Sequence, residues 1–365
     1  MLDLDQLLRY AVERGASDVH IKVGSPPFLR VDGRLERTDE QTVSPVETER
    51  IAFAIMPKQR AEEFIASSEA DFAYSVSGLG RFRVNVMRQR GSVGLVLRRV
   101  QSDIPSFEAL GLPPVVKKLT DHQRGLILVT GPTGSGKTTT LGAMIDFIND
   151  RYNKHIVTIE DPIEILHADR SSIVNQREVG TDTADFNAAL KRVLRQDPDV
   201  ILVGEMRDVE TVKTALTAAE TGHLVFSTLH TISATDSINR IIDFFPPHEQ
   251  RQVRMSLAAS LRGIVSQRLV EKREGGRAPA VEVLVATGRV FDKIVNAEET
   301  HEIEQIIAEG EYYGMQTFDQ SLLNLYKQGL IDLREALATS TTPHDLRLMI
   351  EQHTMEVAAE QAAAG

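Results

Sequence analysis

The stretch GLILVTGPTGSGKT, residues 125–138, decides the fold of this chain. Residues 125–130 are mainly apolar without alternation, which predicts a strand covered on both faces of a parallel sheet. The residues that follow fit the pattern G-x-x-x-x-G-K-[ST] and precede a helix expected from about Lys137. This context is typical of a phosphate-binding P-loop, formed here by Gly131, Pro132, Thr133, Gly134, Ser135, Gly136, Lys137 and Thr138, with Thr139 beside them.

The chemistry of such a loop follows from its residue types. Glycines let successive backbone N–H groups converge on phosphate, and the helix that follows adds the positive end of its dipole. Lys137 can reach the β- and γ-phosphate oxygens, and the Thr138 hydroxyl can bind Mg²⁺. Guanine specificity usually needs Asn-Lys-x-Asp, whereas the Asn153-Lys154 pair continues with His155-Ile156. The sequence therefore predicts a site for Mg²⁺-ATP.

The surrounding pattern indicates an α/β domain over residues 116–365, helix-rich from about residue 290. Further apolar runs at 156–157, 200–203 and 224–226 are separated by helical segments. One of these helices, 186–194, has apolar residues at helical spacing, with Thr183 as its expected N-cap. Alternation of apolar strands with helices predicts a parallel sheet with helices on both faces.

The first hundred residues have a different pattern. A helix is expected over residues 2–13 and helical structure over 44–67, because their apolar residues recur at helical spacing. Short alternating stretches at 18–23, 28–31, 80–87 and 92–97 predict strands, and Asp32-Gly33 is a hairpin signal. Residues 1–100 are therefore expected to form a small α+β domain with an antiparallel sheet. Residues 101–115 hold three prolines and a glycine, which indicates a linker.

Composition excludes several classes of function. With 41 basic and 52 acidic residues the net charge is −11, which argues against nucleic acid as a partner. The absence of cysteine excludes disulfides, thiolate nucleophiles and Cys-ligated zinc. No signal-peptide pattern and no apolar run of about 18 residues is present, so a cytoplasmic protein without direct membrane insertion is expected.

Acidic residues follow two of the predicted strands. Glu160, Asp161 and Glu164 come after one strand, and Glu205 comes after another. Strand C-terminal ends face the ligand crevice of an open parallel sheet. Glu164 is therefore expected to activate water and Glu205 to bind the metal, although the two roles could be exchanged. The alternative is a helix-capping or surface role, which suits Asp161 especially well.

Two histidines bracket the strand at 224–229. His223 and His230 are seven residues apart, so they cannot share one strand face or form a simple metal pair. His230, at the strand end, is the better candidate for sensing the γ-phosphate. The alternative for either residue is an ordinary core or turn histidine.

Several blocks in order resemble the type II/IV secretion superfamily ATPases, most closely the PilT family of type IV pilus retraction motors. They are the Walker A block at 131–140, an Asp box at 158–164, a Walker B block at 195–208 and a His box at 221–231. Residues 15–21 and 80–91 also look like that family. The resemblance implies a RecA-like P-loop ATPase domain, a smaller PAS-like N-terminal domain, a homohexamer and an inner-membrane pilus platform protein as partner.

The resemblance also assigns residues. Glu164 matches the proposed water-activating residue, Glu205 the Walker B acid, and His223 and His230 the His box. Arg81, Arg83 and Arg98 resemble arginines that reach the nucleotide phosphates when the domains close, a task that suits a guanidinium fork. Their alternative is a set of solvated charges on a strand.

The branch of the superfamily follows from further comparison. Extension and secretion ATPases are longer at the N-terminus and usually carry a tetracysteine module, so this chain resembles the retraction branch, which drives twitching motility. Residues 290–299 read VFDKIVNAEE where that branch has an AIRNLIRE-like segment, and Asp292 and Asn296 replace its two arginines. An ATP-binding accessory or regulatory subunit without retraction activity is therefore the alternative, and a nucleic-acid translocase is disfavoured by the charge.

Overall fold

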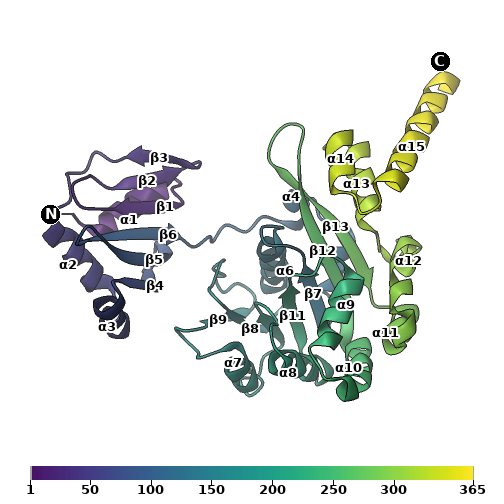
Figure 1. The fold of residues 1–365 in the computed structure, drawn as a ribbon, viewed down its shortest axis with the longest axis horizontal. Coiled ribbons are helices and arrows are strands. Elements are labelled where there is room, and N and C mark those ends of the chain that lie inside the picture. The colour runs from purple at the N-terminus through teal and green to yellow at the C-terminus, as the bar shows by residue number, and fades with distance from the viewer. Residues whose placement is uncertain (1, 365) are drawn as a thin grey trace. The chain divides into compact units, whose positions relative to one another are not determined.

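The computed structural model describes residues 2–364, with side chains placed through residue 355. Its residues group into two compact units (Figure 1). The N-terminal unit runs to Asp103 and includes Glu164–Leu166, and the C-terminal unit comprises Ile104–Ile163 and the chain from His167 onward. Among the described residues, no helix is long and apolar enough to cross a membrane.

The N-terminal unit is built on a six-stranded sheet in which all neighbours are antiparallel, in the order β3-β2-β1-β6-β5-β4. Three helices share one apolar core with this sheet. The elements are α1 (Leu4–Glu13), β1 (Asp18–Ile21), β2 (Phe28–Val31), β3 (Arg34–Arg37), α2 (Pro45–Ile55), α3 (Lys58–Ser67), β4 (Glu69–Val76), β5 (Gly80–Gln89) and β6 (Ser92–Arg99).

Local chemistry explains most of these elements. Asp32 and Gly33 both have positive φ, 46° and 78°, which a tight two-residue hairpin between β2 and β3 requires. The helical stretch expected over 44–67 is two helices rather than one, because Pro57 lacks the N–H that a continuous helix needs. Strands β3 and β4 were not predicted, and β3 has no buried residue that would give it an apolar alternation.

The C-terminal unit contains a seven-stranded sheet in the order β13-β12-β7-β11-β10-β8-β9. All neighbours are parallel except the β12–β13 hairpin. The strands are β7 (Gly125–Thr130), β8 (His155–Glu160), β9 (Ile173–Glu178), β10 (Val200–Val203), β11 (Leu224–Leu229), β12 (Leu261–Glu271) and β13 (Arg277–Val285).

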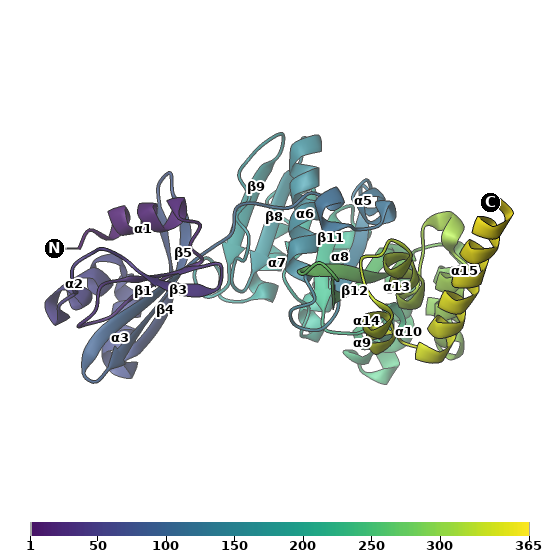
Figure 2. The same ribbon diagram turned by 90° about the horizontal axis from the view of Figure 1, so that it is seen from above.

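Helices cover both faces of this sheet, and from Gly288 onward the described chain is built of helices (Figure 2). They are α4 (Phe107–Leu110), α5 (Pro114–Leu119), α6 (Lys137–Arg151), α7 (Phe186–Val193), α8 (Val209–Glu220), α9 (Ala234–Asp243), α10 (Pro247–Ser260), α11 (Gly288–Val295), η1 (Ala297–Glu302), α12 (Ile303–Ala308), η2 (Glu311–Tyr313), α13 (Phe318–Lys327), α14 (Leu333–Thr339) and α15 (Pro343–Ala364).

Strand β7 shows why its sequence is apolar without alternation. Leu126 and Leu128 pack into a core with α7 to α12 on one face, and Ile127 and Val129 pack into a second core with α4, α5 and α6 on the other. All four side chains are fully buried, since each face of the strand is covered. The predicted α/β class is confirmed.

The segment 101–115, interpreted as a linker, contains the boundary between the two units at Asp103, but it is structured from Phe107 onward, because Phe107, Leu112 and Val115 belong to the core on the α6 face. One N-cap was predicted wrongly. Helix α7 is capped by Asp185, whose side chain accepts a hydrogen bond from Ala188 N, rather than by Thr183. The N-cap of α7 was therefore predicted two residues too early in the sequence.

Candidate nucleotide site

Three predicted motifs follow the carboxyl ends of three adjacent strands. The P-loop follows β7, His230 follows β11 and Glu205 lies just beyond β10, and these strands are neighbours in that order. Main-chain hydrogen bonds connect the ends, from Gly131 N to Leu229 O (3.3 Å) and from Met206 N to Thr228 O (3.3 Å). The Thr228 hydroxyl also donates to Gly204 O at 2.6 Å. The fold therefore gathers these segments at one edge of the sheet.

The P-loop needs glycine for two separate reasons. Gly131, Gly134 and Gly136 have φ of 142°, 80° and 88°, values that side chains rarely adopt. A Cβ on Gly131 would lie 2.3 Å from Gln267 O, and one on Gly136 would lie 2.7 Å from Gln267 Nε2. The backbone of β12 therefore leaves no room for a side chain at Gly131, whereas at Gly136 the positive φ and the Gln267 side-chain amide together disfavour one.

Lys137 and Ser135 give the loop its polar interior. Lys137 is buried, and its ammonium donates to Gly131 O (2.8 Å) and Pro132 O (2.9 Å). Burial lowers the pKa of Lys137, and the nearby Glu205 carboxylate opposes that shift. The buried Ser135 hydroxyl has no hydrogen-bond partner among the described residues. A cradle with a spare hydroxyl, a lysine and a helix N-terminus fits a phosphate group.

Glu205 is the acid that the structure brings to this cradle. Its side chain is 12% exposed, and its Oε2 lies 2.6 Å from Arg207 Nε and 3.7 Å from His230 Nε2. Within the described chain no group of three or more His, Cys, Asp or Glu side chains could hold a metal ion. Mg²⁺ beside a nucleotide is usually held by one or two side-chain oxygens together with phosphate oxygens, and the assignment of Thr138 and Glu205 to this role stays a prediction. The residues present fit that arrangement.

The Asp box divides between the two units. Glu160 is buried and accepts hydrogen bonds from Thr158 Oγ1 (2.6 Å) and Gln176 Nε2 (3.1 Å), which is a structural role. Glu164 groups with the N-terminal unit, where its Oε1 lies 2.7 Å from Arg83 Nη2. The assignment of Glu164 to water activation stays a prediction.

The three arginines predicted to bind phosphate lie on strands β5 and β6. Arg81 and Arg83 are two residues apart and so share one face of β5, and Arg83 is the cross-strand partner of Arg98. Arg98 Nε donates to Asp18 Oδ1 at 2.8 Å. Two like charges directly opposite each other are unfavourable. The carboxylates of Asp18 and Glu164 offset this repulsion, and the nucleotide contacts of the arginines stay a prediction.

His223 and His230 lie at opposite ends of β11. Seven residues of parallel strand span about 23 Å, so one chain cannot bring both rings to the same phosphate. The His223 ring nitrogen Nδ1 is 3.0 Å from Ala218 O, and its carbonyl accepts from Gly125 N at the start of β7. Within this chain His223 thus lies at the sheet edge away from the P-loop, and its contact with nucleotide stays a prediction.

The sequence reasoning missed the residues of β12 that support the loop. Thr140 Oγ1 donates to Gln267 Oε1 at 2.8 Å, and Thr130 Oγ1 donates to Ser266 Oγ at 3.0 Å. Ser266 and Gln267 are both buried. The available signal was the polar pair Ser266-Gln267 directly after the apolar Ile264-Val265, since buried polar side chains in a strand need partners.

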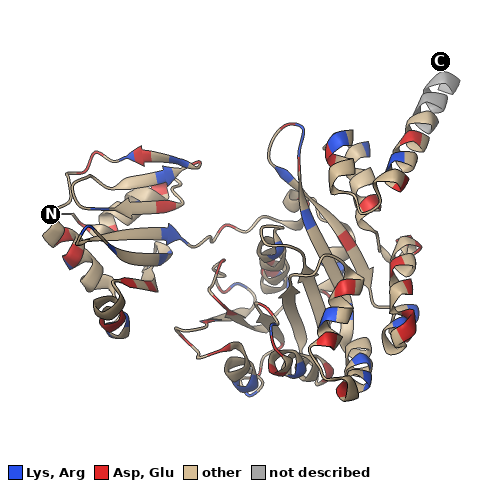
Figure 3. Ribbon diagram, viewed as in Figure 1, with Lys and Arg blue, Asp and Glu red and all other residues tan. Residues whose placement is uncertain are grey.

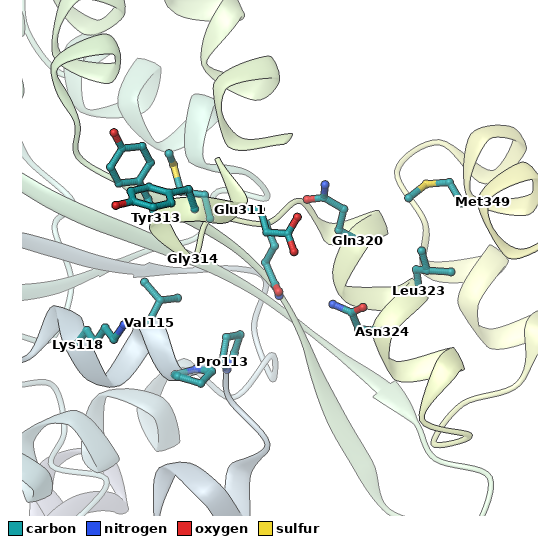
Figure 4. A pocket seen from close by; sticks show the side chains of 14 residues that line it. Pro113, Val115, Lys118, Glu311, Tyr313, Gly314, Gln320, Leu323, Asn324 and Met349 are labelled. Atoms are coloured by element: carbon teal, nitrogen blue, oxygen red, sulfur yellow. The ribbon is translucent and has the colours of Figure 1, made fainter. Parts of the chain in front are cut away.

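A separate pocket of about 540 Å³ lies in the C-terminal unit (Figure 4). It is lined by the start of α5, by η2, by α13 and by Met349 of α15, with Tyr313, Leu323 and Asn324 among its side chains. No residue of the P-loop lines it. The pocket therefore takes no part in the phosphate site.

Known proteins resemble this chain over most of its length. The type II/IV secretion system protein family matches residues 1–311. The type IV pilus retraction ATPase PilT of Pseudomonas aeruginosa is 43% identical over 344 residues, covering 94% of this chain and 100% of that protein. The type IV pilus ATPase PilU of the same organism is 44% identical over 351 residues, covering 96% and 92%. A crystal structure of the pilus retraction motor PilT with bound ADP superimposes with a TM-score of 0.85 at 47% identity, covering 95% and 99%.

Proposed function

The chain belongs to the type II/IV secretion system protein family, and from this premise we propose that it is an ATPase that powers retraction of type IV pili. The observation that carries the proposal is the convergence of Lys137, Glu205 and His230 at the carboxyl edge of the β7–β11–β10 sheet. A binding loop alone would not support hydrolysis. A carboxylate and an imidazole beside the loop supply groups that hydrolysis needs.

The chain's own residues would act mainly by position and charge. Backbone N–H groups of the loop and the Lys137 ammonium would hold the β- and γ-phosphates of ATP and stabilise charge on the transferred phosphoryl group. Burial strengthens this electrostatic stabilisation because the local dielectric is low. Mg²⁺, when bound, would neutralise phosphate charge, with the Thr138 hydroxyl and Glu205 as the residues that would hold it.

Hydrolysis also needs a carboxylate that activates the attacking water. Glu164 would supply it if Glu205 binds the metal, and Glu205 would supply it if the two roles are exchanged. Glu164 is the proposed water-activating residue and Glu205 the proposed metal-binding residue. His230, 3.7 Å from Glu205, would orient that carboxylate or contact the γ-phosphate. Separate Glu164→Gln and Glu205→Gln variants would distinguish the roles. The variant of the metal-binding residue should lose both Mg²⁺ binding and turnover, whereas the variant of the water-activating residue should lose turnover and keep Mg²⁺ binding.

The motor function adds assembly to this chemistry. We propose a ring of six copies in the cytoplasm, in which nucleotide binding closes the domains so that Arg81, Arg83 and Arg98 reach the phosphates. Rigid-body closure of this kind converts phosphate contacts into movement. The ring would act on an inner-membrane platform protein of the pilus, and not on nucleic acid or lipid. Support comes from the matches to pilus ATPases over nearly the full chain.

One observation favours a second function, that of an accessory or regulatory subunit. From α11 to η2 the described chain is rich in acidic residues (Figure 3). Lys293, a basic residue of α11, is paired internally with Glu299 (2.7 Å) and Glu302 (2.8 Å). Residues 290–299, which occupy the position of the AIRNLIRE-like segment, therefore have mainly acidic charged side chains where that segment has two arginines. The chain is also as similar to PilU as to PilT.

Lys137→Ala tests the ATPase assignment. The variant is expected to lose at least 100-fold in turnover, because an oriented charge on the transferred phosphate is removed. Lys191→Ala is the matched control, since Lys191 is an exposed surface lysine paired with Glu210. Wild-type turnover by the Lys137 variant would contradict the site.

Gene deletion then separates the two functions. Loss of twitching with retained surface pili, restored by the wild-type gene and not by the Lys137→Ala gene, is expected of a retraction motor. Normal retraction after deletion would contradict the motor assignment and support the accessory subunit.

A further inference from the structure

The turn that carries His230 is anchored by a residue from outside the motifs. Residues 230–233 connect β11 to α9, and the backbone N–H of Ala234, the first residue of α9, donates to Glu282 Oε1 at 2.7 Å. Glu282 lies on β13 and is 6% exposed, and Ala234 is fully buried. The Glu282 carboxylate, 48 residues away in sequence, is thus hydrogen-bonded to the residue that directly follows the turn.

We propose that Glu282 is a positioning residue for the hydrolytic site, fixing the 230–233 turn so that His230 stays beside Glu205. The inference rests on the proposed ATPase function, because it concerns how that site is held. Among the described residues, Glu282 makes no hydrogen bond or ion pair with the P-loop or with Glu205, so it acts through the turn. Its removal is expected to affect the rate of the chemical step more than nucleotide binding.

A chain of hydroxyl groups, buried at Ser237 and Thr130, connects this anchored turn to the P-loop. The Thr231 and Ser237 hydroxyls are 2.6 Å apart, and Ser237 Oγ donates to Ser233 O at 2.6 Å. Ser237 Oγ also lies 3.4 Å from Thr130 Oγ1, in the residue directly before Gly131. The start of α9 therefore connects the His230 turn to the strand that leads into the loop. Displacing α9 would disturb both segments at once.

Helix capping alone does not account for Glu282. Ser233 already caps α9, accepting a hydrogen bond from Asp236 N at 3.1 Å. A buried carboxyl is a costly choice for a second cap, and burial raises the pKa of Glu282 to about 7. Glu304 of α12 and Asp236 of α9 raise that pKa further, while the Ala234 N–H and Arg268 of β12 oppose the shift. Residue choices that disfavour stability are typical of functional sites.

The test breaks the contact from each side. Glu282→Leu removes the acceptor. Ala234→Pro removes the donor and also displaces the Glu282 carboxylate, because the ring Cδ would occupy the position of the N–H hydrogen that faces Oε1 at 2.7 Å; the backbone itself accepts Pro at the first helical position. Ser233 has the extended conformation, φ −144° and ψ 167°, that a residue before Pro prefers. Each variant is expected to lower kcat for ATP about tenfold, with KM changed less than twofold and binding of a fluorescent ADP analogue unchanged. Glu282→Gln keeps the acceptor oxygen and is expected to restore most of the turnover.

Asp319→Leu is the matched control. Asp319 is a buried acid of α13 that accepts hydrogen bonds from Thr341 N and Thr342 N in the connection between α14 and α15, and its removal should lower stability without changing kcat. Wild-type kcat in Glu282→Leu or Ala234→Pro, or an equal loss in Asp319→Leu, would overturn the inference. If one variant does not fold, the other still decides. Absence of turnover in the wild-type protein would instead contradict the ATPase function itself.

Discussion

Replacing Glu282 with glutamine is expected to stabilise the C-terminal unit at pH 8 and to have little effect near pH 4.5. Glu282 belongs to β13, and its carboxyl group interacts with residues of α9 and α12. Burial raises the pKa of this carboxyl from its ordinary value of 4.5 to about 7. A raised pKa means that the folded state prefers the protonated form. The contribution of this group to stability is therefore fully present below about pH 4.5 and is lost as the pH rises through 7.

The magnitude follows from the size of the shift. Each pKa unit corresponds to about 1.4 kcal/mol, so the rise from 4.5 to about 7 corresponds to roughly 3.5 kcal/mol in the free energy of unfolding. Glutamine has no ionisable group and keeps an oxygen that can accept the Ala234 N–H. The difference between variant and wild type should therefore grow between pH 5 and 7 and level off by about pH 8.

Urea denaturation at several pH values, followed by tyrosine fluorescence, measures this difference, because the chain has no tryptophan. Asp319→Asn is the control. Burial alone would raise the pKa of Asp319, but hydrogen bonds from Thr342, Thr341 and Ser340 outweigh it and the pKa is lowered. Its contribution is lost only as pH falls below about 4, so that variant should show no pH dependence between pH 5 and 8. A Glu282→Gln difference that is constant over this range would refute the reasoning.

Two further predictions concern the support of the P-loop. Gly136→Ala places a Cβ 2.7 Å from Gln267 Nε2 at a residue with φ 88°, and it should weaken ATP binding at least tenfold in a nucleotide titration. Gly275→Ala, at φ 87° in open space, should leave binding unchanged, and equal effects of both changes would contradict the role of the close contact. Gln267→Ala leaves the buried Thr140 hydroxyl without its acceptor and should lower the free energy of unfolding by about 1–3 kcal/mol. An unchanged urea midpoint would show that the hydrogen bond does not matter.

The part of the site that is contiguous in sequence could be predicted in detail. The P-loop, the strand before it and the helix after it are one segment, and the glycine pattern describes a backbone shape that is local. Glu205 and His230 were also reachable, because both follow apolar strands and the carboxyl ends of parallel strands meet at one edge. These inferences needed only strand polarity and spacing.

Residues that meet through the fold could not be predicted in the same way. Gln267 and Glu282 lie on β12 and β13, more than one hundred residues after the P-loop, and no local pattern indicates their partners. Phe107 looked like part of a linker because its neighbours include proline and glycine, yet its ring is buried under the sheet. His223 matched a motif by position, but strand geometry directs it away from His230.

The cross-links among Gly131, Leu229, Thr228 and Gly204 have a consequence for how such a site is emptied. Because these loops are hydrogen-bonded to one another, no single loop can open independently to release the product. Release of ADP would therefore require movement of a part of the protein outside this sheet edge. The amide protons of Gly131 and Met206 should then exchange slowly with solvent in both the ATP-bound and the ADP-bound state, even if the domains move relative to one another.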